Sequence, residues 1–212
     1  MYFIKNNIKK LIISSAIILF PIIVGWILWN KLPQRIPIHW NLEGAADGYG
    51  SKTFAVFGIP AFLLFVHWLC AFGTCFDKKN KDQHQKAINI VFWICPVVSL
   101  YVSTMVYLFS FGFNISIPSL SFSLLGITFI IIGNLLPKIK PNRTLGIKLP
   151  WTLKSEENWN RTHRLAGWVW VFGGIAIVLS GLLELFWGMI AVLVVMLLVP
   201  VIYSIVLYMN GI

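Results

Sequence analysis

The sequence is poor in charge: only 11% of its 212 residues are Asp, Glu, Lys or Arg, whereas 58% are hydrophobic. Soluble domains usually carry about 25% charged residues. All four charged residue types are absent from six long intervals, which are roughly 11–29, 54–76, 87–111, 119–137, 165–183 and 186–208. Each is long enough to cross a bilayer as a helix. The composition excludes a large soluble core and predicts an all-α polytopic membrane protein with six transmembrane helices.

Cysteine is scarce as well. The three cysteines, Cys70, Cys75 and Cys95, lie within or at the ends of the apolar intervals. An odd number without metal-type spacing predicts neither a disulfide framework nor a zinc site, so we interpret them as small packing residues. The spacings typical of serine hydrolases, zinc proteases and phosphate-binding loops are also missing. We therefore expect no enzyme, no resident metal and no cofactor.

Apart from cysteine and tyrosine, His67 is the one titratable side chain well inside an apolar interval. Ionisable groups within a membrane are functional candidates. We favour the simpler interpretation, in which a neutral His67 bonds to a neighbouring helix. The absence of Asp, Glu, Lys and Arg from the intervals argues against ion-coupled or proton-coupled transport.

The net charge of +10 is distributed unevenly along the chain. If the six intervals alternate across the bilayer, Lys31, Arg35 and Lys52 lie on one side and the remaining 14 of the 17 Lys and Arg residues on the other. The positive-inside rule places the larger group, and with it both termini, in the cytoplasm. A basic rim that faces anionic membrane lipids explains the charge. We expect no direct contact with nucleic acid.

The interval 30–53 is the predicted outward loop. Pro33 and Pro37 favour extended backbone before them, and Asp47-Gly48 is typical of a tight turn, so we expect a compact, shaped loop. Its mixed polar and aromatic side chains are candidate contacts for an external partner: His39, Trp40, Asp47, Tyr49 and Lys52. Alternatively, Trp40 and Tyr49 only anchor the loop in the membrane interface while its glycines shape the turn.

The longest polar interval runs from Leu136 to Trp168 and holds seven of the 17 Lys and Arg residues. Its first part, 138–154, contains Pro141, Gly146 and Pro150 and cannot form one regular helix. Ser155 followed by Glu156 and Glu157 is typical of a helix start. We therefore predict a helix from about 155 that continues into the fifth span.

Within this predicted helix, Glu157 and Arg161 are four residues apart and can pair, and Trp159 and His163 share a face. The interval as a whole supplies candidates for docking a soluble partner or for a family motif: Asn142, Arg143, Gly146, Lys148, Pro150, Trp151, Trp159 and His163. Arg and Trp are typical contact residues. The alternative is inward folding, with Asn142, Arg143 and Trp151 capping helix ends and packing against the bundle. Both interpretations stay open at this point.

The sequence also suggests two halves, 1–111 with the outward loop and 112–212 with the cytoplasmic loop 138–164. Leu32-Pro33-x-x-x-Pro37 recurs as Leu136-Pro137-x-x-x-Pro141, each time after the first span of a three-span half. Two such halves would have opposite orientations, as the inverted repeats of many transporters do. Chance is the alternative explanation.

The two polar loops resemble a known family. Pro37-x-His39-Trp40 and Gly44-x-x-Asp47-Gly48-Tyr49-Gly50-Ser51-Lys52 are similar to the outward loop of the small DUF1648-like membrane domain at the N-terminus of SdpI-like proteins. The second half resembles the SdpI domain itself, through Gly133-Asn134, Pro137, Asn142-Arg143-x-x-Gly146-Ile147-Lys148-x-Pro150-Trp151-Thr152, Ser155, Trp159, His163 and Gly167. Many relatives would carry Arg at the position of Lys148. This lysine keeps the positive charge of that Arg but lacks its bidentate fork.

This resemblance implies an immunity protein of the bacterial cytoplasmic membrane that protects against a secreted peptide toxin of the SdpC type. It also implies a receptor role, in which the toxin-engaged protein holds an ArsR-like winged-helix autorepressor at the membrane. The expected partners are therefore the toxin, this repressor and membrane lipids. As a linked hypothesis, the state of the outward face is relayed to the loop 138–164 through spans four and five.

Two functions from other classes remain alternatives. The first is a small transporter or exporter built from an inverted repeat. The second is a membrane enzyme, although a catalytic His163 would have no evident nucleophile or carboxylate partner. An exporter would lower the amount of cell-associated toxin, whereas a sequestering receptor would retain it.

Overall fold

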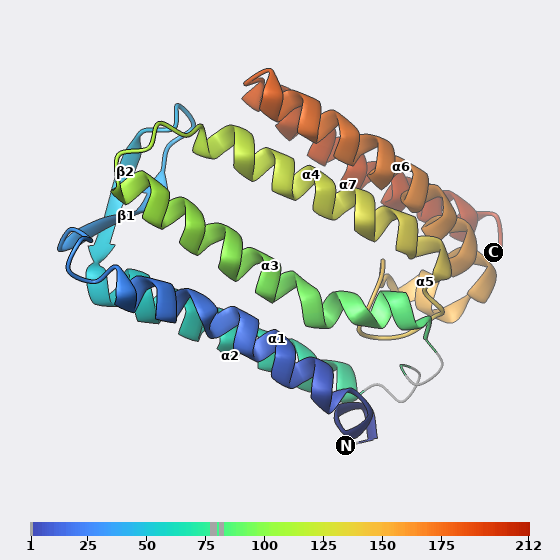
Figure 1. The fold of residues 1–212 in the computed structure, drawn as a ribbon. Helices are drawn as coiled ribbons and strands as arrows, with labels where there is room; N and C mark the ends of the chain where they lie inside the picture. Colours follow the sequence, from blue (N-terminus) through green and yellow to red (C-terminus); the bar gives the residue numbers. More distant parts are fainter. Residues whose placement is uncertain (1, 77–79, 81–82) are drawn as a thin grey trace. The chain divides into compact units, whose positions relative to one another are not determined.

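The computed structural model describes residues 2–76, 80 and 83–212. Within this part of the chain, six helices are long and apolar enough to cross a membrane, which confirms the predicted helical membrane architecture. They are α1 (Tyr2–Ile27), the π-helix η1 (Phe54–Gly58) continuing into α2 (Ile59–Cys75), α3 (Gln85–Ser110), α4 (Ile117–Leu135), α6 (Glu156–Leu182) and α7 (Phe186–Met209) (Figure 1). The lysine-rich loop 77–86, which we expect to be a solvated turn beside the lipid headgroups, lies partly outside the described residues.

Besides the spans, the described residues form a β-hairpin, a 3₁₀ turn and a short helix. A β-hairpin, which the sequence did not predict, joins β1 (Arg35–Trp40) to β2 (Ala46–Ser51) between the first two spans. The 3₁₀ turn η3 (Leu136–Lys138) follows α4, and the short helix α5 (Pro150–Lys154) precedes α6. Between η3 and α5 the chain is irregular, as Pro141 and Gly146 led us to expect.

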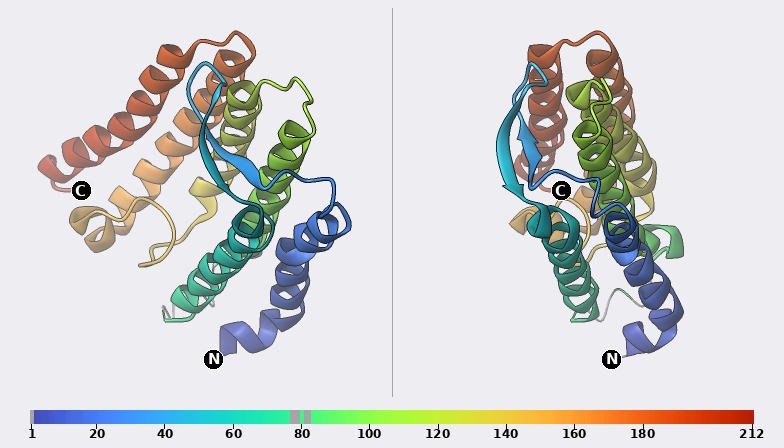
Figure 2. Two further views of the ribbon diagram at one scale, coloured as in Figure 1. Left: turned by 90° about the vertical axis from the view of Figure 1, so that its left-hand side faces the viewer. Right: turned by 60° about the vertical axis from the view of Figure 1, so that its left-hand side comes forward.

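The chain divides into two compact units. Unit 1 comprises Met1–Phe76 and Asn89–Ile117, and so holds α1, the hairpin, α2 and most of α3. Unit 2 comprises Asp77–Ile88 and Pro118–Ile212, and so holds the first turn of α3 together with α4 to α7. Figure 2 gives two further views in which the helices of each unit can be followed.

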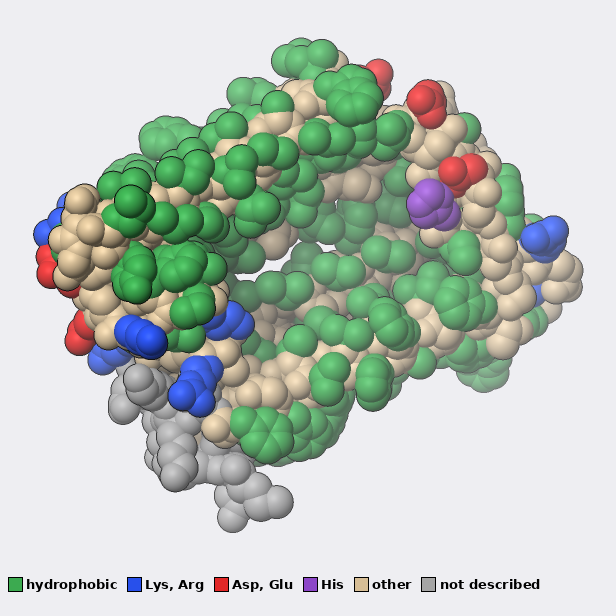
Figure 3. Space-filling view, turned by 180° about the vertical axis from the view of Figure 1, so that it is seen from behind, with side chains coloured by type: hydrophobic (Ala, Val, Ile, Leu, Met, Phe, Trp, Pro, Cys, Tyr) green, Lys and Arg blue, Asp and Glu red, His purple; other side chains and the backbone are tan. Residues whose placement is uncertain are grey.

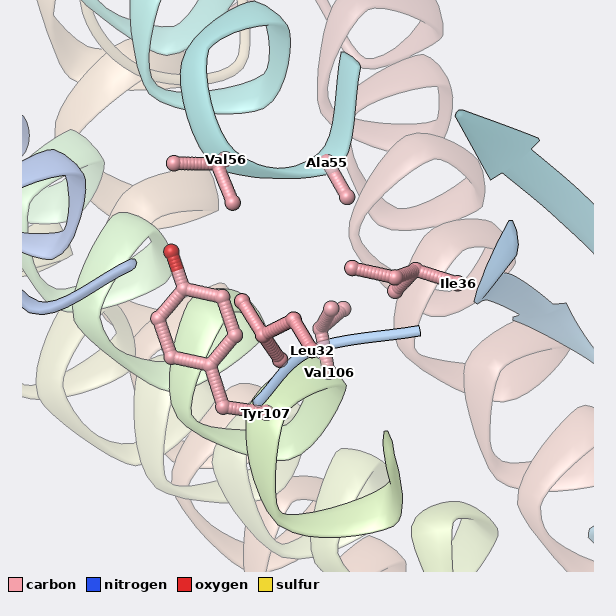
Figure 4. Packing of buried hydrophobic residues seen from close by; sticks show 6 residues of the cluster. All are labelled: Leu32, Ile36, Ala55, Val56, Val106 and Tyr107. Carbon is pink, nitrogen blue, oxygen red and sulfur yellow. The ribbon is translucent and has the colours of Figure 1, made fainter. Parts of the chain in front are cut away.

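The core of unit 1 lies where the hairpin meets the helix ends. Its buried residues are Leu32, Ile36, Ala55, Val56, Val106 and Tyr107, which come from the hairpin, from η1 and α3, and from the loop after α1 (Figure 4). Tyr107 Oη donates a hydrogen bond to the carbonyl oxygen of Pro21 at 3.0 Å. Proline inside a helix removes a backbone hydrogen bond, and this contact ties the affected turn of α1 to α3.

His67 lies fully buried in α2 of unit 1, with Nε2 2.7 Å from Ser14 Oγ on α1. This hydrogen bond between helices agrees with the simpler interpretation of this residue. Side chains on the outer surfaces of the helices are mostly apolar, for example Trp26, Phe65 and Trp187, as suits contact with lipid tails. Figure 3 shows hydrophobic side chains covering much of the helix surface in view.

Glycines set the distance between α4 and α6 in unit 2. A Cβ added at Gly126 would come within 2.5 Å of the carbonyl oxygen of Gly174, and one added at Gly133 would come within 2.9 Å of that of Gly167. The pairs 126/174 and 133/167 are one heptad apart on two antiparallel helices. Small residues of this kind let membrane helices approach backbone to backbone, so α4 and α6 form a closely packed pair.

Gly126→Ala is expected to destabilise the protein by ~1–3 kcal/mol, because the new methyl group is forced against backbone atoms of α6 that cannot move away. Thermal unfolding of the purified protein in detergent measures the loss. Gly73→Ala on α2 is the matched control, because nothing lies within 4 Å of its added Cβ. Equal melting temperatures for the two variants would contradict the close α4–α6 contact.

Candidate functional site

The hairpin of unit 1 is short and irregular. β1 and β2 pair antiparallel, with Arg35 opposite Ser51 and Pro37 opposite Tyr49, and register shifts on both sides of His39. At the tip, the Asn41 side chain accepts the Ala45 backbone N–H at 2.8 Å, and Gly44 takes a positive φ of 81°. Glycine adopts this conformation without the steric cost that other residues meet. The loop 30–53 is thus shaped as predicted, but as a two-stranded sheet.

One face of the hairpin packs onto the core of unit 1. Ile36 is buried, and Ile38 and Trp40 contact the same cluster. The Trp40 ring meets Phe109 edge to face, with 5.4 Å between the ring centroids. Trp40 therefore fixes the hairpin to α3, and its ring is only partly available to a partner.

Lys52 fastens the base of the hairpin. It is buried, and its Nζ donates hydrogen bonds to the carbonyl oxygens of Trp29 at 3.0 Å and Leu32 at 3.1 Å. The ammonium also lies 4.8 Å from the centroid of the Trp29 ring, a cation–π contact. Because both acceptors lie in the turns that follow α1, Lys52 joins the two ends of the loop.

Lys52→Met is expected to lower the free energy of unfolding by ~2–3 kcal/mol, because it keeps the apolar stem but leaves two buried carbonyl oxygens without their charged donor. Differential scanning calorimetry of the protein in nanodiscs measures the change. Lys31→Met is the control, because Lys31 is exposed in the same loop. If the two variants melt alike, the Lys52 contacts do not hold the hairpin.

The other face of the hairpin is open to solvent. His39 Nδ1 donates a hydrogen bond to Asp47 Oδ1 at 2.6 Å, and the side chains are 72% and 46% exposed. Gly48 permits this pair, since a Cβ at that position would come within 2.8 Å of the His39 Cβ. Tyr49 lies on the adjacent strand and is half exposed. These three side chains form the exposed face of the hairpin, and Trp40 and Lys52 support it from behind.

The second candidate region lies in unit 2 and is mostly buried. Asn142, 1% exposed, donates from Nδ2 to the carbonyl oxygens of Lys140 and Leu145, at 2.8 and 3.1 Å. Its Oδ1 accepts the backbone N–H groups of Thr144 at 2.8 Å and Leu145 at 2.6 Å, and the Thr144 hydroxyl at 3.0 Å. One carboxamide therefore closes the turn 140–145.

Trp159 and His163 support this turn from α6. Trp159 is fully buried and donates from Nε1 to the Ile139 carbonyl oxygen at 2.7 Å. His163 stacks on it, with 4.0 Å between the ring centroids. Its Nε2 accepts the Ile147 N–H at 2.9 Å and its Nδ1 donates to the Trp159 carbonyl oxygen at 2.8 Å, so the imidazole is neutral.

Gly146 completes this packing. Its φ is +97°, and an added Cβ would overlap His163 Nε2 and lie 3.1 Å from the Trp159 ring. No other residue fits both the backbone conformation and the space. The imidazole, the indole and this glycine therefore form one interlocked contact.

Trp151 and Asn158 tie the same region to the end of α7. Trp151 Nε1 donates to Ser204 Oγ at 3.0 Å, and its ring stacks on Tyr208. Asn158 Nδ2 donates to the Ser204 carbonyl oxygen at 3.0 Å. On α6, Ser155 caps the helix by accepting the Asn158 N–H, and Glu157 pairs with Arg161, as predicted.

Sequence reasoning missed one important member of this region. Gln83, from the connection between α2 and α3, donates from Nε2 to the Lys140 carbonyl oxygen at 2.8 Å and accepts the Lys140 N–H at 3.0 Å through Oε1. Asn80, from the same connection, donates from Nδ2 to the Thr144 hydroxyl at 2.7 Å. We call the buried side chains of this region the polar node: Gln83, Asn142, Thr152, Asn158, Trp159 and His163. Gln83 had no motif around it that marked it.

The residues predicted for docking thus fall into two groups. Asn142, Gly146, Trp151, Trp159 and His163 face inward and form the node or pack against it. This agrees with the interpretation of inward folding for Asn142 and Trp151, but that interpretation was wrong for Arg143, which is exposed. Arg143, Lys148 and Pro150 remain exposed, beside the exposed Lys138, Lys140, Lys154 and Arg164. The exposed surface of the loop is therefore basic, while the node in its interior is neutral and hydrogen-bonded.

Six spans, an exposed hairpin and a buried polar node define a multi-pass helical protein of the cell membrane. The model of the SdpI/YfhL protein family matches residues 138–204, which cover α5, α6, most of α7 and every residue of the node except Gln83. A domain of unknown function, DUF1648, matches residues 16–64, which include the hairpin.

A relative shows the family of the whole chain. "Immunity protein SdpI" of Bacillus subtilis (strain 168) is 30% identical over 191 residues, which are 90% of this chain and 89% of that protein. The chain belongs to the SdpI family. Its relative is an immunity protein and not an enzyme, in agreement with the absence of catalytic motifs in the sequence. No solved structure matches the chain.

Proposed function

We propose that this protein is a membrane immunity protein that protects a bacterial cell from a secreted peptide toxin of the SdpC type by binding it. The site of binding is inferred from one observation. The exposed face of the hairpin, formed by His39, Asp47 and Tyr49, rests on a base that Lys52 and Trp40 hold in place. A rigid base lowers the entropic cost of binding. The two supporting residues act as positioning residues in this proposal.

Expression in a toxin-sensitive strain tests this function. Cells that make the protein should survive an SdpC-type peptide that kills control cells, and they should retain labelled peptide at their surface. Protection accompanied by loss of cell-associated label would instead indicate export. Sensitivity equal to that of the control cells, at verified membrane levels, would contradict an immunity function.

We also propose that both termini and the loop 138–164 face the cytoplasm, with the hairpin outside. The charge distribution supports this orientation. In a cysteine-free background, Gln34→Cys is expected to react with an impermeant maleimide in intact cells, and Lys154→Cys only after lysis. Both positions are exposed. The reverse pattern would leave the hairpin on the wrong side for a secreted toxin.

The exposed basic surface of the loop is a proposed docking site for an ArsR-like repressor. Arg143 and Lys148 are exposed beside the node and present positive charges, which suit an acidic patch on a partner. They do not suit the basic, DNA-contacting face of a repressor. Co-purification of the repressor should depend on the toxin, and indifference to the toxin would remove the signalling role.

The halves 1–111 and 112–212, and a relay between the two loops through spans four and five, are further parts of this proposal. The glycine contacts between α4 and α6 support the relay, because helices packed backbone to backbone move together. The node would respond to a movement of α6, since it is built on the first turns of that helix.

A further inference from the structure

The hairpin is a sheet of only two strands, so each strand has one edge without a ladder partner. Such an edge presents backbone N–H and C=O groups that can pair with another chain. The two edges of this hairpin differ in their ability to do so.

The register shows which backbone groups point outward. Lys52 N–H donates to the Gln34 carbonyl oxygen at 3.0 Å, so residues 34 and 52 form a hydrogen-bonded pair. Hydrogen-bonded and non-bonded pairs alternate in an antiparallel ladder. Ile36 and Gly50 are therefore the next bonded pair, and the pairs 35/51 and 37/49 are not bonded. In β2, the N–H groups of Tyr49 and Ser51 and the C=O of Tyr49 thus point away from β1.

The same alternation shows that the outer edge of β1 is interrupted. Pro37 stands where an outward N–H would be, and proline has none. Proline on an edge strand is a known protection against pairing. The edge of β2 has no proline, and Tyr49 and Ser51 are exposed there. The edge of β2, with outward N–H groups at both Tyr49 and Ser51, is therefore the one better suited to a further strand.

We propose that the toxin binds to the open edge of β2 as an added β-strand, with its backbone paired to Tyr49 and Ser51. This inference rests on the proposed function and gives its mode of recognition. Backbone groups spaced two residues apart recognise an extended peptide and no other class of ligand, because only a peptide carries donors and acceptors at the same repeat.

Exposed side chains of the hairpin favour one orientation of the added peptide segment. Asp47 on β2 and Glu43 at the tip are both acidic and exposed, whereas the neighbouring Lys52 is buried in its own contacts. The added segment is therefore expected to carry a basic residue toward the tip of the hairpin. This arrangement places it next to the His39–Asp47 pair, so the strand edge and the exposed face form one continuous surface.

The test uses synthetic SdpC-type peptides that carry a single N-methyl group at successive positions, with the full-length protein in nanodiscs. N-methylation removes one backbone donor and leaves every side chain in place. Strand addition predicts losses of affinity of about tenfold at alternate positions within one short stretch, and little effect at the positions between them. On the protein side, Tyr49→Pro should weaken binding about tenfold more than Tyr49→Ala, which keeps the N–H.

The outcomes distinguish failure of the proposed function from failure of strand addition. If the wild-type protein binds no peptide, the proposed function falls and this inference falls with it. If it binds but N-methylation shows no alternation, and Tyr49→Pro binds like Tyr49→Ala, recognition is by side chains and the strand edge is not used. The peptide series leaves the protein unchanged, so a folding defect in the proline variant does not decide the result.

Discussion

Asn142→Ala is expected to reduce the amount of folded protein in the membrane substantially. The carboxamide makes five hydrogen bonds within the turn 140–145 while it is almost completely buried. Its removal leaves backbone donors and acceptors without partners, which costs about 3 kcal/mol or more. A protein of ordinary stability loses much of its margin at that cost.

Thermal unfolding in detergent and quantitative immunoblotting of membranes measure this effect. Asn142→Asp is the informative companion, because its carboxylate still accepts three bonds but no longer donates to the Lys140 and Leu145 carbonyl oxygens. It should be nearly as unstable as the alanine variant. Asn160→Ala is the matched control, since Asn160 lies exposed on α6. A normal melting temperature for Asn142→Ala would show that the node does not support the loop.

The six spans were predictable because the signal is local. Each apolar interval is long enough for a bilayer, and a helix satisfies its own backbone hydrogen bonds there. The start of α6 was predictable for a similar reason: the Ser155 cap, the Glu157–Arg161 pair and the stacked Trp159 and His163 all lie within one or two turns.

What the sequence did not reveal depends on contacts between distant segments. Gln83 meets Lys140 across 57 residues, and Lys52 reaches the Trp29 carbonyl oxygen across 23. No local pattern indicates that a lysine in a polar loop is buried, so Lys52 was grouped with the surface residues. The hairpin was missed because proline-rich and glycine-rich segments resemble simple turns, and its two strands are held by the core of unit 1.

The two copies of the Leu-Pro-x-x-x-Pro motif have similar structural surroundings. Leu32 and Leu136, the first residues of each copy, are both buried in the core of their own unit. In each unit, a side chain near the start of the following helical span donates to a backbone carbonyl oxygen close to that leucine: Lys52 to those of Trp29 and Leu32 in unit 1, and Trp159 to that of Ile139 in unit 2. The origin of the two halves by duplication stays a proposal.

Asp47→Asn and His39→Ala are each expected to abolish protection while membrane levels stay normal. The His39 side chain is largely exposed and that of Asp47 nearly half exposed, so their loss costs the fold little. Asp47→Asn removes the charge that orients the His39 ring, and His39→Ala removes the ring itself. Residues at the centre of a contact surface commonly carry much of its binding energy, and a reduction of at least about tenfold in tolerated SdpC-type peptide is expected.

Survival curves over a series of peptide concentrations measure this loss. Gln34→Ala is the control, because Gln34 is exposed at the base of the hairpin and outside the His39–Asp47 pair. The double variant distinguishes a joint action from two separate ones: if the histidine and the carboxylate act as a pair, it is no more sensitive than either single variant. Full protection by both single variants at normal levels would move recognition away from the exposed face of the hairpin. Partial and additive losses would instead make the two residues independent contacts, because a pair that acts as one unit is lost completely with either member.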